Sequence, residues 1–380
     1  MRRHASAGAP LSEEITEADQ RTYEKLVCSK LTDEQVQRIL TPPRVYPAQE
    51  TAIAVHWHPE FVPMELIHGR VDATFPGKQD ELIIPTNHNV INSYDGVFCG
   101  VEIDCYARSF KRKVQFLVHF HISKLEQATV LKQMLKHTFN YRTGQLWEFI
   151  DTILDDRYED RMREAADETG ADQEVIDFVR AGTRKLRVLI DRNETTTPRE
   201  MLRNKIVPRW FDAMRGDQAD RRVDRAKHLL KVVKEIVKRQ FTLEYFYEAQ
   251  EIIEECRALG AGIVIPHPEQ FWPVLLADYD VDGYEVWNPQ SREYTGFLID
   301  TVRRHNKARG ASDRPLLIFM GDDCHMGEKA PDPRNQDKEK AAREVGVQPG
   351  WEDIEIRKSL IVANCDRQTV INEYRNRLLS

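Results

Sequence analysis

Short apolar runs that end in turns occur in two separate parts of the chain, with amphipathic stretches between them. The first group predicts four strands, at residues 52–56, 82–85, 97–103 and 114–121. The second group predicts three strands, at residues 262–266, 284–287 and 316–320. Helical patterns at 271–277 and 294–307 separate these last three. Seven strands with interspersed helices predict an α/β fold of the βα-barrel type.

The stretch between the two groups, residues 123–250, has long helical patterns and almost no strand pattern. We therefore expect a large helical insertion on one loop of the barrel. The rest of the chain divides accordingly. The predicted parts are a helical lead-in (1–49), the first part of the barrel (50–122), its second part (251–330), and a C-terminal loop, strand and helix (331–380). Near the C-terminus, a loop is expected at 327–340, a strand at 360–363 and a helix at 367–379.

The charges of the insertion are segregated along the chain. Residues 151–177 contain eleven acidic residues against three arginines, whereas residues 201–240 contain twelve Lys and Arg against five acidic residues, in a chain of formal net charge −7. Two interpretations remain open. The helices are solvated by mutually complementary charges, or the basic segment 201–240 attracts a phosphate-bearing or nucleic-acid substrate.

Length and composition are those of a water-soluble enzyme. A chain of 380 residues is long enough to bury a sizeable core. No apolar run approaches the roughly 18 to 20 residues of a membrane span, and the first residues lack the apolar stretch of a secretory signal. We expect a cytoplasmic protein. Six scattered cysteines without a C-x-x-C pair predict core thiols rather than disulfides or a zinc knuckle.

Histidines gather at the ends of the predicted strands. Seven of the twelve histidines lie there. His56 and His58 have the same parity in an extended segment, so both side chains leave one face and can bind one or two cations. His119 and His121 repeat the pattern. By the same alternation, Cys324 points away from its neighbours Asp323 and His325. Histidines and carboxylates at successive strand ends are typical of a multi-metal site at one end of a barrel.

Seven motifs in unbroken order give these residues a more specific context. They are an H-x-H, a T-N-H-N, a G-x-E, a V-H, a P-H-P, a G-Y-E-V-W-N-P and a G-D-D-C-H. They begin, in order, at His56, Thr86, Gly100, Val118, Pro266, Gly283 and Gly321. In this order and spacing the chain resembles the PHP (polymerase and histidinol phosphatase) superfamily of metal-dependent phosphoesterases. The resemblance covers roughly residues 50–122 and 255–328.

The resemblance implies a distorted seven-stranded, TIM-like (β/α)7 barrel that holds two or three divalent ions. It implies Glu102 as a bridging carboxylate. The early V-H motif and the insertion before the P-H-P motif are most similar to the branch that hydrolyses nucleotides or trims nucleic acid from the 5′ end. The full implied ligand set is His56, His58, His88, Glu102, His119, His267, Asp323 and His325.

The chain departs from the family pattern at two places. An aspartate or histidine usually follows the first H-x-H by five or six residues, but Pro63 and Met64 stand there. Glu60 or Glu65 could replace it, which leaves the number of ions open. In the T-D-H motif the acid has become Asn87, and this change should weaken the orientation of the neighbouring histidine without abolishing coordination.

Imidazole and carboxylate ligands without thiolate suit Zn²⁺, Mn²⁺ or Fe²⁺ and do not discriminate among them. Two such ions would activate a water molecule and clamp the oxygens of a phosphoryl displacement. We expect Glu102 and Asp323 to be catalytic as ligands. His121 is the candidate general acid, although a supporting or core role remains open. A cationic run before the fourth strand could hold a phosphate or form an exposed hairpin turn. It contains Arg108, Lys111, Arg112 and Lys113.

The sequence therefore predicts a hydrolase of phosphoric esters that acts on nucleotides or nucleic-acid ends. Two alternatives remain. One is a small-metabolite phosphatase of the histidinol-phosphatase kind, which needs a closed pocket rather than a basic groove. The other is a non-catalytic, metal-stabilised PHP module in an assembly, with the insertion as its docking surface. The salt dependence of activity distinguishes the small-metabolite phosphatase from an enzyme that acts on nucleic acid, because binding of a polyanion weakens steeply with ionic strength.

Overall fold

The structure is a computed structural model that describes residues 11–309, 314–334 and 336–380. The first ten residues of the predicted lead-in lie outside the described residues. The chain forms two compact units. Unit 1 comprises the residues up to Lys30 together with Asn140–Thr242, and unit 2 comprises Leu31–Phe139 together with Leu243–Ser380. Each unit has its own apolar core.

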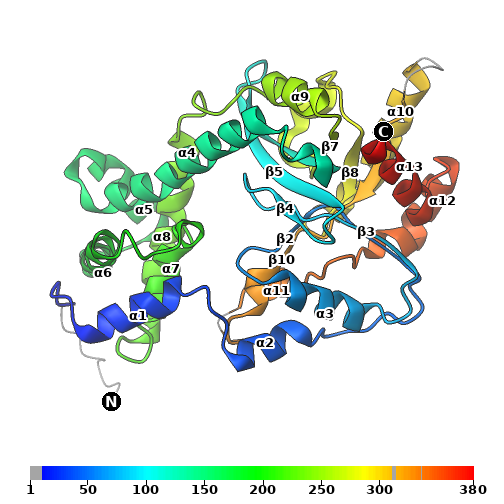
Figure 1. Ribbon diagram of the computed structural model, residues 1–380. Helices are drawn as coiled ribbons and strands as arrows, with labels where there is room; N and C mark the ends of the chain where they lie inside the picture. The colour runs from blue at the N-terminus through cyan, green and yellow to red at the C-terminus, as the bar shows by residue number, and fades with distance from the viewer. Residues whose placement is uncertain (1–10, 310–313, 335) are drawn as a thin grey trace. The chain divides into compact units, whose positions relative to one another are not determined.

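Unit 2 contains a six-stranded sheet in the order β4-β5-β6-β7-β8-β9 (Figure 1). β5 and β6 form a long antiparallel hairpin, β6 and β7 are antiparallel, and β7, β8 and β9 are parallel. All residues of β7 and β8 are buried, which explains their continuous apolar character. The strands are β4 Asn92–Ser93, β5 Phe98–Ala107, β6 Arg112–His121, β7 Gly262–Ile265, β8 Gly283–Trp287 and β9 Leu317–Met320.

Two parallel strand pairs complete the β-structure of unit 2. β1 (Thr51–Ala54) pairs with β3 (Asp80–Ile83), and β2 (Trp57–His58) pairs with β10 (Cys324–His325). All seven predicted strands are therefore present, and the α/β class is confirmed. The described strands form three sheets, none of them closed, so the expected barrel is not seen as one continuous sheet. Residues with positive φ, such as His267 and Asp323, follow β7 and β9, and that conformation cannot continue a ladder.

Helices surround these strands. The predicted helix at 294–307 is α10, whereas 271–277 lies in the 3₁₀ segment η4, which contains Pro273. The helices of unit 2 are α2 Asp33–Leu40, α3 Met64–Thr74, α9 Ala249–Ala258, α10 Thr295–Ala308, α11 Lys338–Ala341, α12 Ile354–Val362 and α13 Arg367–Leu379. Its 3₁₀ segments are η1 Ile122–Lys124, η4 Pro268–Leu276, η5 Arg292–Tyr294, η6 Met326–Lys329 and η7 Pro349–Glu352.

The prediction of a C-terminal strand at residues 360–363 is wrong, because helix α12 ends in this segment. Asp353 caps the helix by accepting a hydrogen bond from the amide of Glu355. Leu360 is buried, whereas Ile361 and Val362 are 69% and 55% exposed. A helix on the surface needs only about one buried residue per turn to pack against the core. This packing outweighs the strand propensity of the β-branched residues Ile361 and Val362. The final helix, α13, is confirmed over residues 367–379.

The loop predicted at 327–340 is more ordered than its composition indicates. Met326, Glu328 and Lys329 of η6 are buried, and α11 begins at Lys338. The amine of Lys329 donates hydrogen bonds to main-chain carbonyls of the next segment, including that of Ala341 at 2.6 Å. Buried hydrogen bonds, rather than apolar side chains, hold this polar stretch in place.

Unit 1 is helical, in agreement with the absence of strand patterns there. Basic residues of α8 pair with acidic ones: Arg225 with Asp172 at 2.9 Å, and Arg239 with Glu164 at 2.6 Å. Such pairs are what the complementary-charge interpretation expects; binding of nucleic acid by 201–240 stays a prediction. The elements are α1 Glu17–Val27, η2 Asp156–Tyr158, α5 Glu159–Thr169, α6 Gln173–Arg192, η3 Arg199–Met201, α7 Ile206–Asp212 and α8 Asp220–Gln240, and α4 spans Thr129–Leu154.

Within the described ranges, none of the helices is both long and apolar enough to span a bilayer. The predicted cytoplasmic location stays a prediction.

Candidate metal centre

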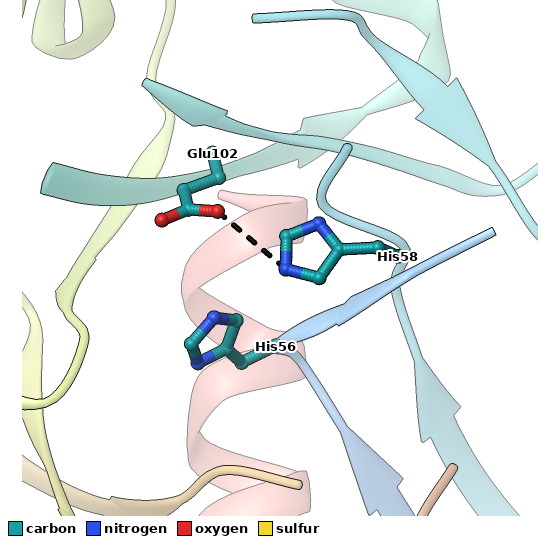
Figure 2. Close-up of side chains that lie close together, drawn as sticks. All are labelled: His56, His58 and Glu102. Carbon is teal, nitrogen blue, oxygen red and sulfur yellow. Dashed lines mark ion pairs between the residues drawn. The ribbon is translucent and has the colours of Figure 1, made fainter. Parts of the chain in front are cut away.

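His56 and His58 stand where β1 passes into β2, and both are almost completely buried. Their rings lie with centroids 5.6 Å apart, on the same side as Glu102 (Figure 2). Trp57 between them packs into a separate apolar cluster. Its main-chain amide donates to the hydroxyl of Thr86 at 3.1 Å, which fixes the segment. The alternation predicted for the H-x-H is therefore present.

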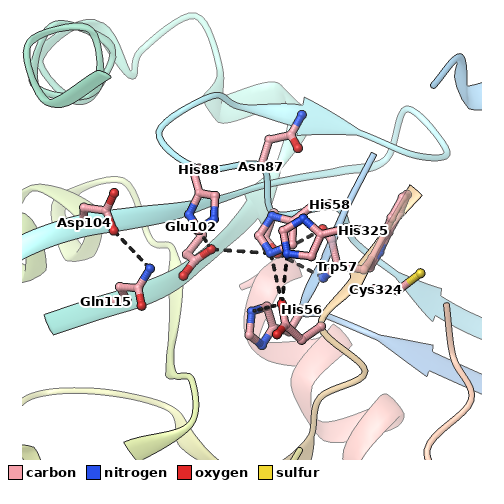
Figure 3. Close-up of polar contacts among 12 residues, drawn as sticks. His56, Trp57, His58, Asn87, His88, Glu102, Asp104, Gln115, Cys324 and His325 are labelled. Carbon is pink, nitrogen blue, oxygen red and sulfur yellow. Dashed lines mark hydrogen bonds and ion pairs between the residues drawn. The ribbon is translucent and has the colours of Figure 1, made fainter. Parts of the chain in front are cut away.

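Glu102 reaches the same place from β5. Its Oε2 lies 3.5 Å from Nε2 of His58 and 2.7 Å from Nδ1 of His88. The amide of Glu102 donates to the carbonyl of Asn87 at 3.1 Å, and the amide of Asn89 donates to the carbonyl of Glu102 at 2.7 Å. These two main-chain bonds place His88 beside the carboxylate (Figure 3). The Asn87 side chain accepts a hydrogen bond from the Glu60 amide at 3.1 Å, so it stabilises a turn of the site.

Asp323 and His325 enter from the turn after β9. The pairing of β10 with β2 sets His325 opposite His58, and their rings stack with centroids 4.2 Å apart. Oδ1 of Asp323 faces three imidazole nitrogens, Nε2 of His56, His58 and His325, at 3.7, 3.5 and 3.4 Å. Asp323 has a φ of 44°. Such left-handed backbone is uncommon outside glycine and occurs preferentially at functional sites.

Cys324 is directed away from the histidines, as the alternation predicts (Figure 3). Its thiol is buried and donates to the carbonyl of Arg343 at 3.2 Å. Burial raises the pKa of this thiol far above its usual range. Cys324 is therefore a core residue and not a thiolate ligand.

The separations between the ligand atoms fit a shared metal ion better than they fit hydrogen bonds. Donor to acceptor distances of 3.4–3.7 Å are longer than ordinary N–H···O bonds. Two ligands that each lie about 2.1 Å from one ion in tetrahedral geometry are about 3.4 Å apart. Among the described residues, neither ring nitrogen of His58 has a hydrogen-bond partner, although the ring is buried. A buried, unsatisfied imidazole is what a metal ligand leaves when no ion is present.

Two groups of three potential ligands come together in this way. They are His56, His58 and Glu102, and His58, Asp323 and His325, with the ligand atoms in each group within 4.8 Å of one another. The groups share His58. Imidazole and carboxylate groups gathered in this way are compatible with binding of divalent metal.

Protonation equilibria at the site follow burial and charge. Burial, with the like charge of His325, lowers the pKa of His58 to about 4, so this ring is neutral and able to bind a metal at neutral pH. Burial opposes protonation of His56, yet the carboxylates of Glu285, Asp323 and Glu102 raise its pKa to about 10, so an ion that binds this ring would displace a proton from it. Burial likewise raises the pKa of Asp323, but the neighbouring imidazoles of His325, His58 and His56 prevail and keep it well below its usual value.

Glu285 is a residue of the site that the predicted ligand set omits. Its carboxylate oxygens lie 3.1 and 3.0 Å from Nδ1 of His56, and it accepts the amide of His267 at 2.8 Å. With Nδ1 of His56 occupied by a carboxylate, Nε2 is the nitrogen left to face an ion. A Cβ on Gly321 would overlap Glu285, so glycine is required there. The motif beginning at Gly283 contains this glutamate, and that is the signal that could have identified it.

His267 and Glu60 lie at the edge of the cluster. The ring of His267 is 5.5 Å from that of His56, and its buried Nδ1 has no hydrogen-bond partner among the described residues. Oε1 of Glu60 lies 3.3 Å from Nδ1 of His325. Glu65, the other proposed substitute for the missing ligand, is exposed on α3. The geometry favours Glu60, acting through His325.

His119 does not join the cluster, although its motif implies a ligand. Its Nε2 donates to the carbonyl of Val55 at 2.9 Å and its Nδ1 accepts from the hydroxyl of Tyr374 at 2.7 Å. Burial lowers its pKa to about 3. An imidazole with both nitrogens engaged has none left for a metal. We therefore leave His119 out of the proposed centre.

His121 is also placed outside the cluster. Its ring contacts Phe98 edge-on at 6.0 Å, and its Nδ1 lies 2.7 Å from the hydroxyl of Ser123. It caps η1 by accepting the amide of Ser123. None of its described contacts joins it to the histidines and carboxylates of the site. Its role as general acid stays a prediction without structural support.

The cationic run before β6 forms a hairpin turn. Arg108, Lys111 and Arg112 are exposed there. Lys113 pairs with the buried Asp104 at 2.6 Å, so its charge is neutralised within the fold. The described geometry favours the exposed-hairpin interpretation of this run over a phosphate site.

Comparisons with known proteins place few constraints on the chain. No family model matches it, and no curated protein matches it. Among solved structures, the crystal structure at 2.40 Å resolution of a provisionally assigned metal-dependent phosphoesterase from Bifidobacterium adolescentis ATCC 15703 is similar, with a TM-score of 0.40 and 16% identity over 83% of this chain and 96% of that chain. At that level of similarity, the function has to be argued from the residues and geometry of this chain alone.

Proposed function

We propose that this protein is a metal-dependent phosphoesterase whose centre is held by His56, His58, Glu102, Asp323 and His325. The observation that carries the proposal is the convergence of three imidazole nitrogens on one carboxylate oxygen of Asp323 at 3.4–3.7 Å. His88, bound to Glu102, and His267, beside His56, complete the ligand set. The motif order of the PHP superfamily supports the same assignment.

The ligand residues and their neighbours divide the work between them. Divalent ions bound there would lower the pKa of a water molecule and neutralise charge on the phosphoryl group. Glu285 holds the ring of His56 in one tautomer, with Nε2 toward the centre. The depressed pKa of His58 keeps its ring neutral, which leaves one nitrogen with a lone pair for an ion. Glu285, His56 and His58 are each about 1% exposed, so water does not compete for these contacts.

For the overall architecture we propose the distorted PHP barrel. Main-chain hydrogen bonds across the breaks between the sheets support it. The amide of Asp323 donates to the carbonyl of His56 at 2.9 Å, and that of Thr86 donates to the carbonyl of Trp57 at 2.8 Å. The bonds between Glu102 and residues 87–89 continue the same series. The antiparallel β5, β6 and β7 account for the distortion, because a regular βα barrel has only parallel strands.

A nucleotide or nucleic-acid end is the substrate we favour, and an exposed aromatic cluster supports this choice. The indole of Trp272 contacts the rings of Tyr294 and Phe297 at 5.3 and 5.5 Å, and all three are between 38% and 54% exposed. Trp272 follows Phe271, whose ring is 5.5 Å from that of His267. Exposed rings bind bases by stacking. A small amino-alcohol phosphate has no use for such a surface.

Isotope labelling combined with metal analysis tests the proposal. Purified protein should contain divalent metal, lose activity to a chelator and recover it with Mn²⁺ or Zn²⁺. Hydrolysis in ¹⁸O-water should place the label in the released phosphate, because attack at phosphorus breaks the P–O bond. Label in the alcohol would exclude this reaction. A panel of 5′-phosphorylated oligonucleotides, nucleoside monophosphates and histidinol phosphate decides the substrate, and activity on histidinol phosphate alone would favour the small-metabolite alternative.

A further inference from the structure

The segment after α11 contacts the acidic motif of the site. Arg343 lies there and is only 8% exposed. Its Nη1 is 2.6 Å from Oδ2 of Asp323 and donates to the carbonyl of the same residue at 3.2 Å. Three residues later, the amide of Gly346 donates to Oδ2 of Asp322 at 2.9 Å. A part of the chain outside the motif region thus holds both carboxylates of the D-D-C-H sequence.

A second donor approaches the same oxygen of Asp323. The side-chain amide of Gln290 donates to Oδ2 at 2.6 Å. Oδ1 instead faces the nitrogens of His56, His58 and His325. The two oxygens of Asp323 therefore have different environments, one saturated by protein donors and one directed into the centre. A carboxylate held in this way offers a single oxygen to a cation.

A buried network fixes the position of Arg343. The amine of Lys329 donates to the main-chain carbonyl of Arg343 and pairs with Glu344 at 2.8 Å. Glu344 in turn binds Arg70 through two hydrogen bonds of 2.6 Å. Arg70 also donates to the carbonyl of Ile39 at 2.6 Å, at the end of α2. All four charged side chains are at least 92% buried. The main chain at Arg343 is thus held in place by groups that do not depend on an ion.

We infer that Arg343, assisted by Gln290, is a positioning residue that holds Asp323 as a one-oxygen ligand for the ion at His58 and His325. This inference rests on the proposed metal centre. Partners in the second layer of a metal site typically change affinity by about 10–100-fold. The two ions should respond differently, because Glu102 of the other ligand group lacks this clamp and is held by His88 instead.

The test is a calorimetric titration of chelator-stripped protein with Mn²⁺, repeated with Zn²⁺. Wild-type protein should bind two ions. Arg343→Met keeps an unbranched side chain that can stay buried but removes its donors. It should weaken one of the two binding events about 10–100-fold and leave the other within about twofold. Arg343→Lys retains one donor nitrogen, so its affinity for the affected ion should lie between those of the wild type and of Arg343→Met. Arg334→Met, an 89% exposed arginine in the same region, is the matched control.

Thermal unfolding of the stripped proteins separates positioning from folding. If Arg343 were merely structural, its substitution would lower the unfolding temperature and weaken the binding of both ions together. Such a result, or unchanged binding of both ions, would overturn the inference. Failure of the wild-type protein to bind Mn²⁺ or Zn²⁺ would instead refute the proposed metal centre, and the role of Arg343 with it.

Discussion

The hydroxyl of Tyr374, on the last helix of the chain, lies 2.7 Å from Nδ1 of His119 on β6 and so engages a ring that the resemblance implies as a metal ligand. The rings meet edge to face, with centroids 5.7 Å apart. A Cβ on Gly262 would be 2.5 Å from this hydroxyl, so the close approach of α13 to the sheet requires glycine there. α13 thus joins His119 to the core.

His119→Gln should therefore leave the metal content unchanged and lower stability. The loss at pH 7 should be about 1–3 kcal/mol, because a buried, doubly hydrogen-bonded group is replaced by an imperfect one. Urea unfolding of chelator-stripped protein, together with metal analysis of untreated protein, measures both quantities. Loss of a metal equivalent in this variant would show that His119 is a ligand after all.

The same variant should also change the pH dependence of stability. The pKa of His119 is about 3 when folded against 6.5 as a model value, so between these values the unfolded chain binds a proton that the folded chain does not. Its contribution to stability is therefore complete above pH 6.5 and is lost as the pH falls. The difference between wild type and His119→Gln should narrow by about 2 kcal/mol from pH 7 to pH 5. A difference that grew on acidification would contradict the assigned neutral ring.

Removal of either central carboxylate should abolish activity. Glu102→Gln and Asp323→Ala each leave cationic charge at the centre uncompensated. We therefore expect turnover to fall at least about 100-fold and the protein to lose one equivalent of metal. Metal analysis and hydrolysis of p-nitrophenyl phosphate measure these losses. His305→Ala, on α10 and outside the ligand set, should change neither. An Asp323 variant with full metal content and turnover would disprove the site.

Trp272→Ala should impair the hydrolysis of substrates that contain bases and spare that of substrates without them. Loss of the stacking surface should raise KM for a 5′-phosphorylated oligonucleotide about 5–100-fold, since stacking contributes about 1–3 kcal/mol per base. Turnover of p-nitrophenyl phosphate should stay the same. Tyr245→Ala, at a 63% exposed aromatic elsewhere in unit 2, is the control. A wild-type protein that dimerises through these rings, with dimerisation lost in the variant, would instead assign the cluster to self-association.

Charge reversal on α8 tests the insertion. Arg221→Glu with Lys231→Glu changes two exposed positions of this helix. If the basic segment guides a polyanion, KM for an oligonucleotide should rise several-fold and its salt dependence should fall, while kcat on a small ester is spared. Arg163→Glu, on the acidic α5, provides the control reversal. Equal responses of both substrates would mean that the insertion is structural.

The sequence by itself determined the strands and the residue types that follow them. Period-two and continuous apolar patterns located seven of the described strands, because burial of one or both faces imposes these patterns directly; the two-residue strands β2, β4 and β10 are too short to show one. His56 and His58 could be found as candidates because alternate residues of an extended segment share one face, and His88 and Asp323 because they lie at the ends of predicted strands. The α12 segment could not be predicted correctly. Only its packing, with Leu360 inside and both Ile361 and Val362 exposed, distinguishes a surface helix from a short strand, in which Val362 would face inward with Leu360.

Only the tertiary structure decided which of the candidate groups are available to an ion. His119 and His58 look alike in the sequence, yet one ring is saturated by Val55 and Tyr374 and the other has no hydrogen bond among the described residues. Arg343 binds Asp323 directly, although the two residues are 20 positions apart. The network beside this contact extends to Arg70, through its bond to Glu344. Hydrogen bonds between distant segments leave no periodic trace in a single sequence, because their partners are selected by the fold and not by local spacing.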